Sequence, residues 1–90
     1  MDDARRKRAR LRAWRRGFRE MDLILGSFAD RHIATLEEAD LLRFEALLEV
    51  ADPDLYAWIS GTAPIPSEFD HALMNAIRAN AQAPRPIAGG

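Results

Sequence analysis

The stretch Arg15-Arg16-Gly17-Phe18-Arg19-Glu20 brings together charge and backbone freedom, the two properties that a contact surface needs. Arg16 and Glu20 are four positions apart, so a helix that opens here would place both side chains on one face. Gly17 lies between two segments that read as helix, where glycine costs about 1 kcal/mol relative to alanine. The glycine therefore predicts a left-handed turn or a close approach by another backbone. The alternative is a solvated ion pair beside a helix boundary.

A second stretch with contact chemistry is Asp52-Pro53-Asp54-Leu55-Tyr56-Ala57-Trp58. Aspartate is a preferred N-cap, proline suits the first helical position, and a further carboxylate favours the positive end of a helix. Interpreted as a site, it is an exposed acidic edge beside an aromatic ring, suited to a basic partner surface. Interpreted as structure alone, it is a capped helix with Leu55 and Trp58 in the core.

The formal net charge of −1 conceals a strong asymmetry along the chain. Residues 1–19 carry nine basic and two acidic residues, a net charge of +7, whereas residues 20–90 have a net charge of −8. A helix is expected over residues 5–15, with a thin apolar stripe of Leu11 and Trp14 that docks it on the core. The basic arm is expected to meet an acidic surface, either within the fold or on a partner.

Signatures of catalysis and of metal binding are missing from the sequence. It contains no cysteine, which excludes disulfides and thiolate chemistry. No phosphate-cradling glycine-rich loop, dinucleotide fingerprint or nucleophile elbow occurs. His32 and His71, the two histidines, fall on separate predicted helices without acidic residues at metal-ligand spacing. We therefore expect no catalytic residue and no metal site.

The length of 90 residues corresponds to one domain, which we place at residues 1–83, followed by a flexible Pro/Gly tail over residues 84–90. No apolar run approaches the ~18 residues that span a bilayer. The basic beginning is not followed by an apolar segment of the kind found in secretory signals. A cytoplasmic protein without membrane insertion is the simplest expectation.

Apolar residues recur at helical spacing along most of the chain. Within residues 18–33, the side chains of Phe18, Met21, Leu25 and Phe28 follow a 3-4-3 pattern, which predicts an amphipathic helix. No stretch alternates with period two for long enough to form a strand.

Start signals divide the remainder into three further helices. Thr35 and Glu38 read as a capping box for a helix that ends near residue 50. The Asp-Pro-Asp stretch opens a short helix that stops at Gly61, and Ser67 caps a last one. The predicted fold class is therefore all-α, a compact and mostly antiparallel bundle of five helices.

Both stretches with contact chemistry match a known pattern. Arg16-Gly17-Phe18-Arg19-Glu20 resembles the RGxxE motif of the succinate dehydrogenase flavinylation factors, the SdhE family. Leu47-Leu48-Glu49, followed by the Asp52–Trp58 stretch, is similar to that family's second signature, an acidic-Pro-acidic turn leading into a helix with a tryptophan. The resemblance extends from about Arg5 to about Ala79, with the length and order of the family, and leaves the tail unmatched.

The resemblance implies an assembly factor rather than an enzyme. Members are small five-helix proteins that bind the flavoprotein subunit of succinate dehydrogenase, and often that of fumarate reductase, and promote covalent attachment of FAD to a histidine there. FAD would thus belong to the partner, with no cofactor bound stably here, and we expect a monomer when the protein is free. Gly17 would allow close approach of the flavoprotein. The expected partner-binding residues are Trp14, Arg15, Arg16, Gly17, Glu20, Asp52, Pro53, Asp54 and Tyr56.

The competing interpretation is a nucleic-acid-binding or antitoxin-like module that uses the basic arm. Nine cations could neutralise several phosphates. However, residues 20–90, with a net charge of −8, would repel a polyanion. Among the cations, only Trp14 offers a surface for base stacking. We therefore expect no nucleic-acid partner.

Overall fold

The computed structural model describes residues 3–82, so the predicted tail at residues 84–90 lies outside the described residues. Among the described residues every regular element is a helix, which confirms the all-α prediction. The elements are α1 (Asp3–Trp14), α2 (Arg19–His32), α3 (Glu38–Leu48), α4 (Asp52–Ser60), the short 3₁₀ helix η1 (Ser67–Phe69) and α5 (Ala72–Gln82).

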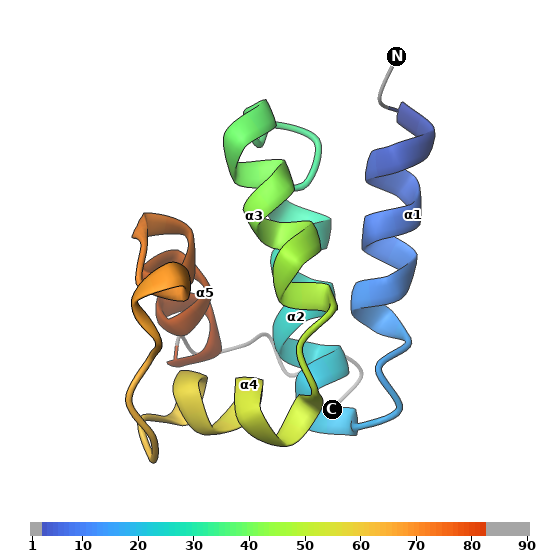
Figure 1. Ribbon diagram of the computed structural model, residues 1–90. Coiled ribbons are helices and arrows are strands. Elements are labelled where there is room, and N and C mark those ends of the chain that lie inside the picture. The colour runs from blue at the N-terminus through green and yellow to red at the C-terminus, as the bar shows by residue number, and fades with distance from the viewer. Residues whose placement is uncertain (1–2, 83–90) are drawn as a thin grey trace.

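The first three helices form an antiparallel set, and α4 lies across one end of it (Figure 1). Helix α1 packs mainly against α2 and also touches α3, while α5 packs against α2, α3 and α4. The connection between α1 and α2 and the connection between α3 and α4 both lie at the end that α4 crosses. The two stretches singled out in the sequence are therefore brought to the same end of the molecule.

The core forms from the predicted apolar faces of α2 and α3. Met21, Leu25 and Phe28 are buried, and the ring of Phe28 stacks on that of Phe44 with centroids 6.0 Å apart. Phe18 departs from the predicted stripe because α2 begins only at Arg19, which leaves the Phe18 ring at the surface with 36% exposure.

Helix α1 docks through two small residues and through only one member of the predicted apolar stripe, Trp14. Ala9 and Ala13 are buried against the core, whereas Leu11 is 43% exposed. Trp14 covers Gly26 of α2 so closely that a Cβ atom at Gly26 would lie 2.2 Å from the indole ring. Gly26 thus permits the close packing of α1 on α2, and the prediction that Leu11 docks the helix is wrong.

The helix starts differ from the predicted ones. The hydroxyl of Thr35 donates to the carbonyl of His32 at 3.1 Å, and α3 begins at Glu38 after the N-cap position, Glu37. The predicted capping box is therefore wrong, because a local bond to the preceding turn uses the threonine hydroxyl. The N-cap of α4 is Ala51, so Asp52 is the first helical residue and not the cap.

The last helix also starts later than predicted. Ser67 opens η1, and α5 begins at Ala72. The backbone N–H of Met74 donates to Nδ1 of His71 at 3.1 Å, so the histidine ring satisfies an amide in the first turn of α5. The predicted end of α4 is confirmed, because Gly61 ends it in the left-handed conformation with φ of +85°.

Candidate functional site

Gly17 forms a left-handed turn between α1 and α2, with φ of +86°. No described atom beyond its chain neighbours lies within 4 Å of the position where a Cβ atom would stand. The first of the two predicted roles, a left-handed turn, is therefore confirmed. The glycine faces open space, so its exposed backbone is available to another molecule.

The side chain of Arg16 points into the fold. Its Nε donates to Oδ1 of Asp52 at 2.7 Å, and its two terminal nitrogens donate to the carbonyls of Leu48 and Val50. Only 9% of the side chain is exposed. These carbonyls belong to the C-terminal end of α3, where backbone oxygens lack intrahelical donors, so the guanidinium closes the corner between α3 and α4.

The expected pairing of Arg16 with Glu20 on one helical face is wrong. Because α2 begins at Arg19, Arg16 precedes the helix and is turned toward the corner, while Glu20 is exposed in the first turn of α2. The backbone N–H of Arg16 instead donates to the carboxylate of Asp22 at 2.7 Å. Asp22, which the sequence did not single out, thus fixes the turn that precedes its own helix.

An aromatic contact joins the same two stretches at the surface. The rings of Phe18 and Tyr56 meet edge to face, with centroids 5.3 Å apart and planes at 70°. Glu20 and Tyr56 both border a hollow of about 190 Å³ that α5 closes on its far side. Phe18 was missed as a candidate because its apolar side chain fitted the helical stripe; its position directly after Gly17 was the available signal.

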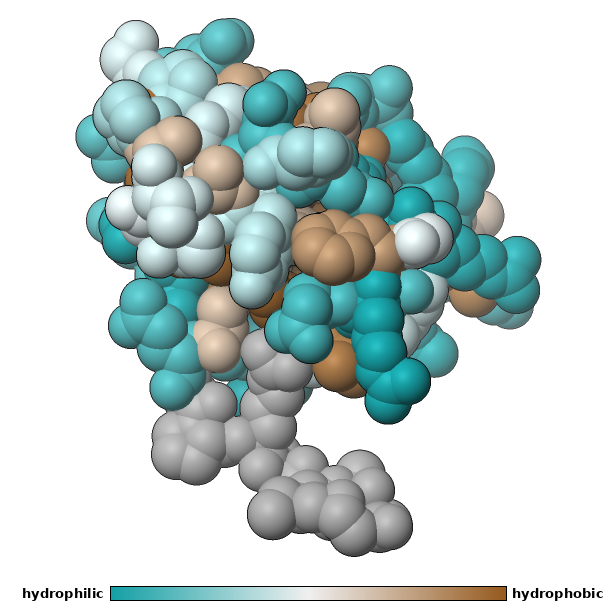
Figure 2. All heavy atoms as spheres, turned by 90° about the horizontal axis from the view of Figure 1, so that it is seen from below, coloured by the Kyte–Doolittle hydropathy of each residue, from teal (hydrophilic) through white to brown (hydrophobic). Residues whose placement is uncertain are grey.

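We call the surface formed by Arg15, Gly17, Phe18, Glu20 and Tyr56 the turn surface. Figure 2 looks at the molecule from below, onto the end that α4 crosses, and shows hydrophobic side chains set among hydrophilic ones. Within the turn surface, Phe18 and Tyr56 supply the aromatic part, and Arg15 and Glu20 supply the charges. Arg16 and Asp52 lie beneath this surface and hold it in place.

The other predicted contact residues divide between surface and interior. Arg15, Pro53 and Asp54 are exposed. Trp14 is half-buried over Gly26, and its Nε1–H donates to Oδ1 of Asp30 at 3.1 Å. The indole therefore joins α1 to α2, and a role for it in partner contact stays a prediction, as it does for the exposed residues.

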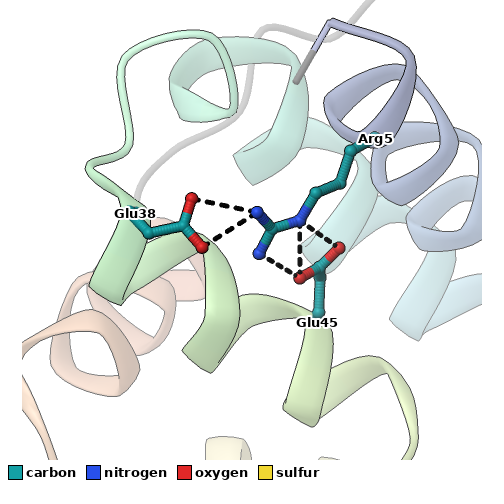
Figure 3. Close-up of polar contacts among 3 residues, drawn as sticks. All are labelled: Arg5, Glu38 and Glu45. Carbon is teal, nitrogen blue, oxygen red and sulfur yellow. Dashed lines mark hydrogen bonds and ion pairs between the residues drawn. The ribbon is translucent and has the colours of Figure 1, made fainter. Parts of the chain in front are cut away.

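The basic arm meets acidic residues within the fold, as the first of the two predicted alternatives states. Arg5 of α1 donates to both carboxylates of Glu38 and Glu45 on α3, at 2.7–3.0 Å (Figure 3). This guanidinium lowers the pKa of Glu45. Further ion pairs join Arg10 to Asp30, Arg12 to Glu49 and Arg16 to Asp52.

Metal clusters and membrane spans do not occur among the helices of residues 3–82. No group of three or more histidine or carboxylate side chains that could hold a metal ion is present in this part of the chain. None of the helices described here is long and apolar enough to cross a membrane.

The fold is that of a small helical protein in which the two motif stretches meet at one corner through the Arg16–Asp52 ion pair. The chain belongs to the family described as "Flavinator of succinate dehydrogenase", which matches residues 7–81. This confirms the resemblance drawn from the two sequence motifs.

Named relatives agree with the family assignment. The chain is 37% identical over 73 residues to "Succinate dehydrogenase assembly factor 2, mitochondrial" of Dictyostelium discoideum. The matched residues make up 81% of this chain and 52% of the relative. It is 38% identical over 65 residues to "FAD assembly factor SdhE" of Acetobacter pasteurianus, and this match covers 72% of the present chain and 60% of the relative. A protein of the same name from Haemophilus ducreyi is 35% identical over 69 residues, covering 77% and 84%. The chain thus spans little more than half the length of the first two relatives. No solved structure was found to match it.

Proposed function

We propose that this protein binds the flavoprotein subunit of succinate dehydrogenase and promotes covalent attachment of FAD to that subunit. The observation that carries the proposal is the family match over residues 7–81. It is supported by the convergence of the two sequence motifs on one corner through the Arg16–Asp52 ion pair. The flavoprotein of the related fumarate reductase is a second partner that the same surface would suit.

The contribution of this chain would be positioning rather than chemistry of its own. FAD, held by the flavoprotein, would supply the isoalloxazine ring, whose 8α-methyl group loses a proton and becomes bonded to a histidine nitrogen while the ring takes up the electron pair and is thereby reduced. That step requires the histidine to be held against the ring and negative charge on the ring to be stabilised. A bound protein can supply both by fixing the orientation of the flavoprotein domains.

Different residues of the corner would have different parts in this contact. Gly17, without a side chain, would let the flavoprotein backbone approach the turn. Glu20 would bind a basic group, and the Phe18–Tyr56 pair would supply apolar contact. Arg16 would act as a positioning residue, because its guanidinium is engaged within the fold.

Two substitutions test the proposed contact surface. Glu20→Ala removes an exposed carboxylate, so its melting temperature should stay close to that of the wild type while covalent flavin on the partner falls. Gly17→Arg places a side chain in the contact and should abolish binding, at a stability cost of about 1 kcal/mol for the positive φ. The measurement is in-gel flavin fluorescence of the co-expressed flavoprotein subunit, beside thermal melting of each purified variant.

Two further variants serve as controls. Gly17→Ala introduces the same backbone strain as Gly17→Arg with a minimal side chain, so it separates strain from obstruction. Glu37→Ala removes an equally exposed carboxylate at the start of α3, at the other end of the molecule (Figure 1). Wild-type flavin attachment with both Gly17→Arg and Glu20→Ala would exclude the turn surface from the mechanism.

A further inference from the structure

A second surface adjoins the turn surface along the length of α1. It is a groove of about 450 Å³. Its lining includes Arg8, Leu11, Arg12 and Arg15 on one side and Leu48 and Ala51 on the other. We call it the α1 groove. Arg16 and Asp52 also line it, so it is continuous with the corner beneath Gly17.

The α1 side of the groove is one face of a helix. Arg8, Leu11, Arg12 and Arg15 are spaced at i, i+3, i+4 and i+7, and the backbone N–H of Arg15 still donates to the carbonyl of Arg12 at 3.2 Å. This face is turned away from the core, because Leu11 is 43% exposed. Leu11 is therefore only partly covered by the domain, and it lies between arginines.

The charges of the groove are unevenly compensated. Arg12 pairs with Glu49, Arg16 pairs with Asp52, and Glu45 is held by Arg5, so the three nearby carboxylates are already engaged. Arg8 and Arg15 are exposed, and neither has an ion pair with any residue in the range 3–82. The groove therefore presents two exposed cations that form no ion pair, with Leu11 between them, and of these Arg8 also contributes, after Arg5, to the lowered pKa of Glu45.

We infer that the α1 groove holds an acidic segment of the partner protein, with two carboxylates on Arg8 and Arg15 and an apolar side chain over Leu11. This inference rests on the proposed function, and the partner is the flavoprotein subunit. Arg8 lies within α1 and Arg15 in the turn that directly follows it, so a rise of about 1.5 Å per residue places the two about 10 Å apart along the helix axis. An extended partner segment presents residues i, i+2 and i+4 on one face, so carboxylates four residues apart, about 13 Å along the strand, would flank an apolar side chain over Leu11, and the long arginine side chains take up the difference.

Nucleic acid fits this groove less well than an acidic peptide does. Its floor of Leu11 and Leu48 is apolar, and no aromatic side chain of the described chain lines it for base stacking. Glu49 and Asp52 would repel a continuous phosphate backbone more strongly than a segment that carries two separate carboxylates.

Charge reversal at the two free arginines tests the inference. The affinity of purified flavoprotein subunit is measured by calorimetry for the full chain carrying Arg8→Glu, Arg15→Glu, or both. We expect the double variant to bind about tenfold or more weakly, since each lost pair contributes up to about fivefold and the new carboxylates repel the segment. The wild-type affinity should also fall more steeply with salt than that of the double variant.

A neighbouring residue supplies the matched control. Lys7→Glu makes the same change of charge on the same helix, but Lys7 lines a different hollow, with Arg6, Arg10 and Ile33. Its affinity should stay within about twofold of the wild type. Leu11→Asp should weaken binding because it removes the apolar contact at the floor of the groove. Far-ultraviolet circular dichroism of each variant checks that it is folded.

The outcomes separate this inference from the proposed function. Weaker binding by Arg8→Glu and Arg15→Glu than by Lys7→Glu supports the groove. Equal binding by all three, while Gly17→Arg still abolishes binding, overturns the groove and leaves the proposed function intact. No binding by the wild type overturns both. Binding of a labelled DNA duplex that depends on Arg8 and Arg15, with flavoprotein affinity unchanged, overturns the acidic-segment inference in favour of a phosphate site.

Discussion

The two ends of α1 are attached to the rest of the fold in different ways. At the N-terminal end, Arg5 is held by Glu38 and Glu45, with 28% of the arginine side chain exposed and 62% of Glu38. At the C-terminal end, Trp14 lies on Gly26, and the following Arg16 is inserted into the α3–α4 corner with 9% exposure. One end is an ion pair in contact with water, and the other is a packed and hydrogen-bonded junction.

Burial decides how much each attachment contributes. Exposed ion pairs are weak because water and salt screen them and because two long side chains must be ordered. Removing one partner of a buried pair is costly, because the charge and carbonyls left behind lose both their partner and their water. The C-terminal junction, which also positions the turn surface, is therefore expected to be the stronger one.

The largest loss of stability is expected from Arg16→Ala. This change leaves Asp52 and the carbonyls of Leu48 and Val50 without their donor, and it should lower the free energy of unfolding by about 3 kcal/mol. Urea unfolding followed by circular dichroism measures it. Arg43→Ala, which breaks an exposed pair with Asp40, should stay within about 0.5 kcal/mol. Equal losses for the two variants would contradict the contrast in burial.

An intermediate loss is expected from Gly26→Ala. The new methyl group would lie 2.2 Å from the Trp14 ring, so the indole must shift, at a cost of about 1–3 kcal/mol. The better helix propensity of alanine offsets about 1 kcal/mol of this. Thermal unfolding of a double-mutant cycle with Trp14→Ala isolates the contact: in that background Gly26→Ala should no longer destabilise. If the cycle shows no coupling energy, the contact between Trp14 and Gly26 does not stabilise the junction.

The smallest effect, and the one most sensitive to solution conditions, is expected from Glu45→Gln. Because Arg5 lowers the pKa of Glu45 in the folded state, the folded protein binds a proton there more weakly than the unfolded chain does. The stabilisation is therefore fully present above the unfolded-state pKa and is lost as the pH falls through the folded-state pKa. Melting temperatures of wild type and variant should differ slightly at neutral pH, converge in acid, and converge with added salt. A difference that persists in acid would assign the effect to packing.

The helices were predictable because burial follows a local period. The spacing of Met21, Leu25 and Phe28 along the sequence is sufficient to identify the buried face of α2, and Gly61 identifies the end of α4. Helix starts were less predictable, because Thr35 and Ser67 can bond to more than one backbone group, and the choice depends on the turn around them.

The site was only half predictable, for a different reason. Its two motifs were visible in the sequence, but the pairing of Arg16 with Asp52 joins residues 36 positions apart. With 13 basic and 14 acidic residues in the chain, local spacing favoured Glu20 as the partner of Arg16. The left-handed turn at Gly17 redirects the chain before α2 begins, and it is this turn that makes Asp52 rather than Glu20 the partner of Arg16.

Because Trp14 packs on Gly26 of α2, its fluorescence can report on the contact between α1 and α2. The chain has two tryptophans, and the other, Trp58, stacks on Phe69 with centroids 5.2 Å apart, away from α1. In a Trp58→Phe variant, Trp14 alone would emit, and its spectrum would shift to longer wavelength when α1 separates from α2 and water reaches the indole. The detachment of one helix could then be timed separately from unfolding of the remaining bundle, both in the free protein and on addition of the proposed flavoprotein partner.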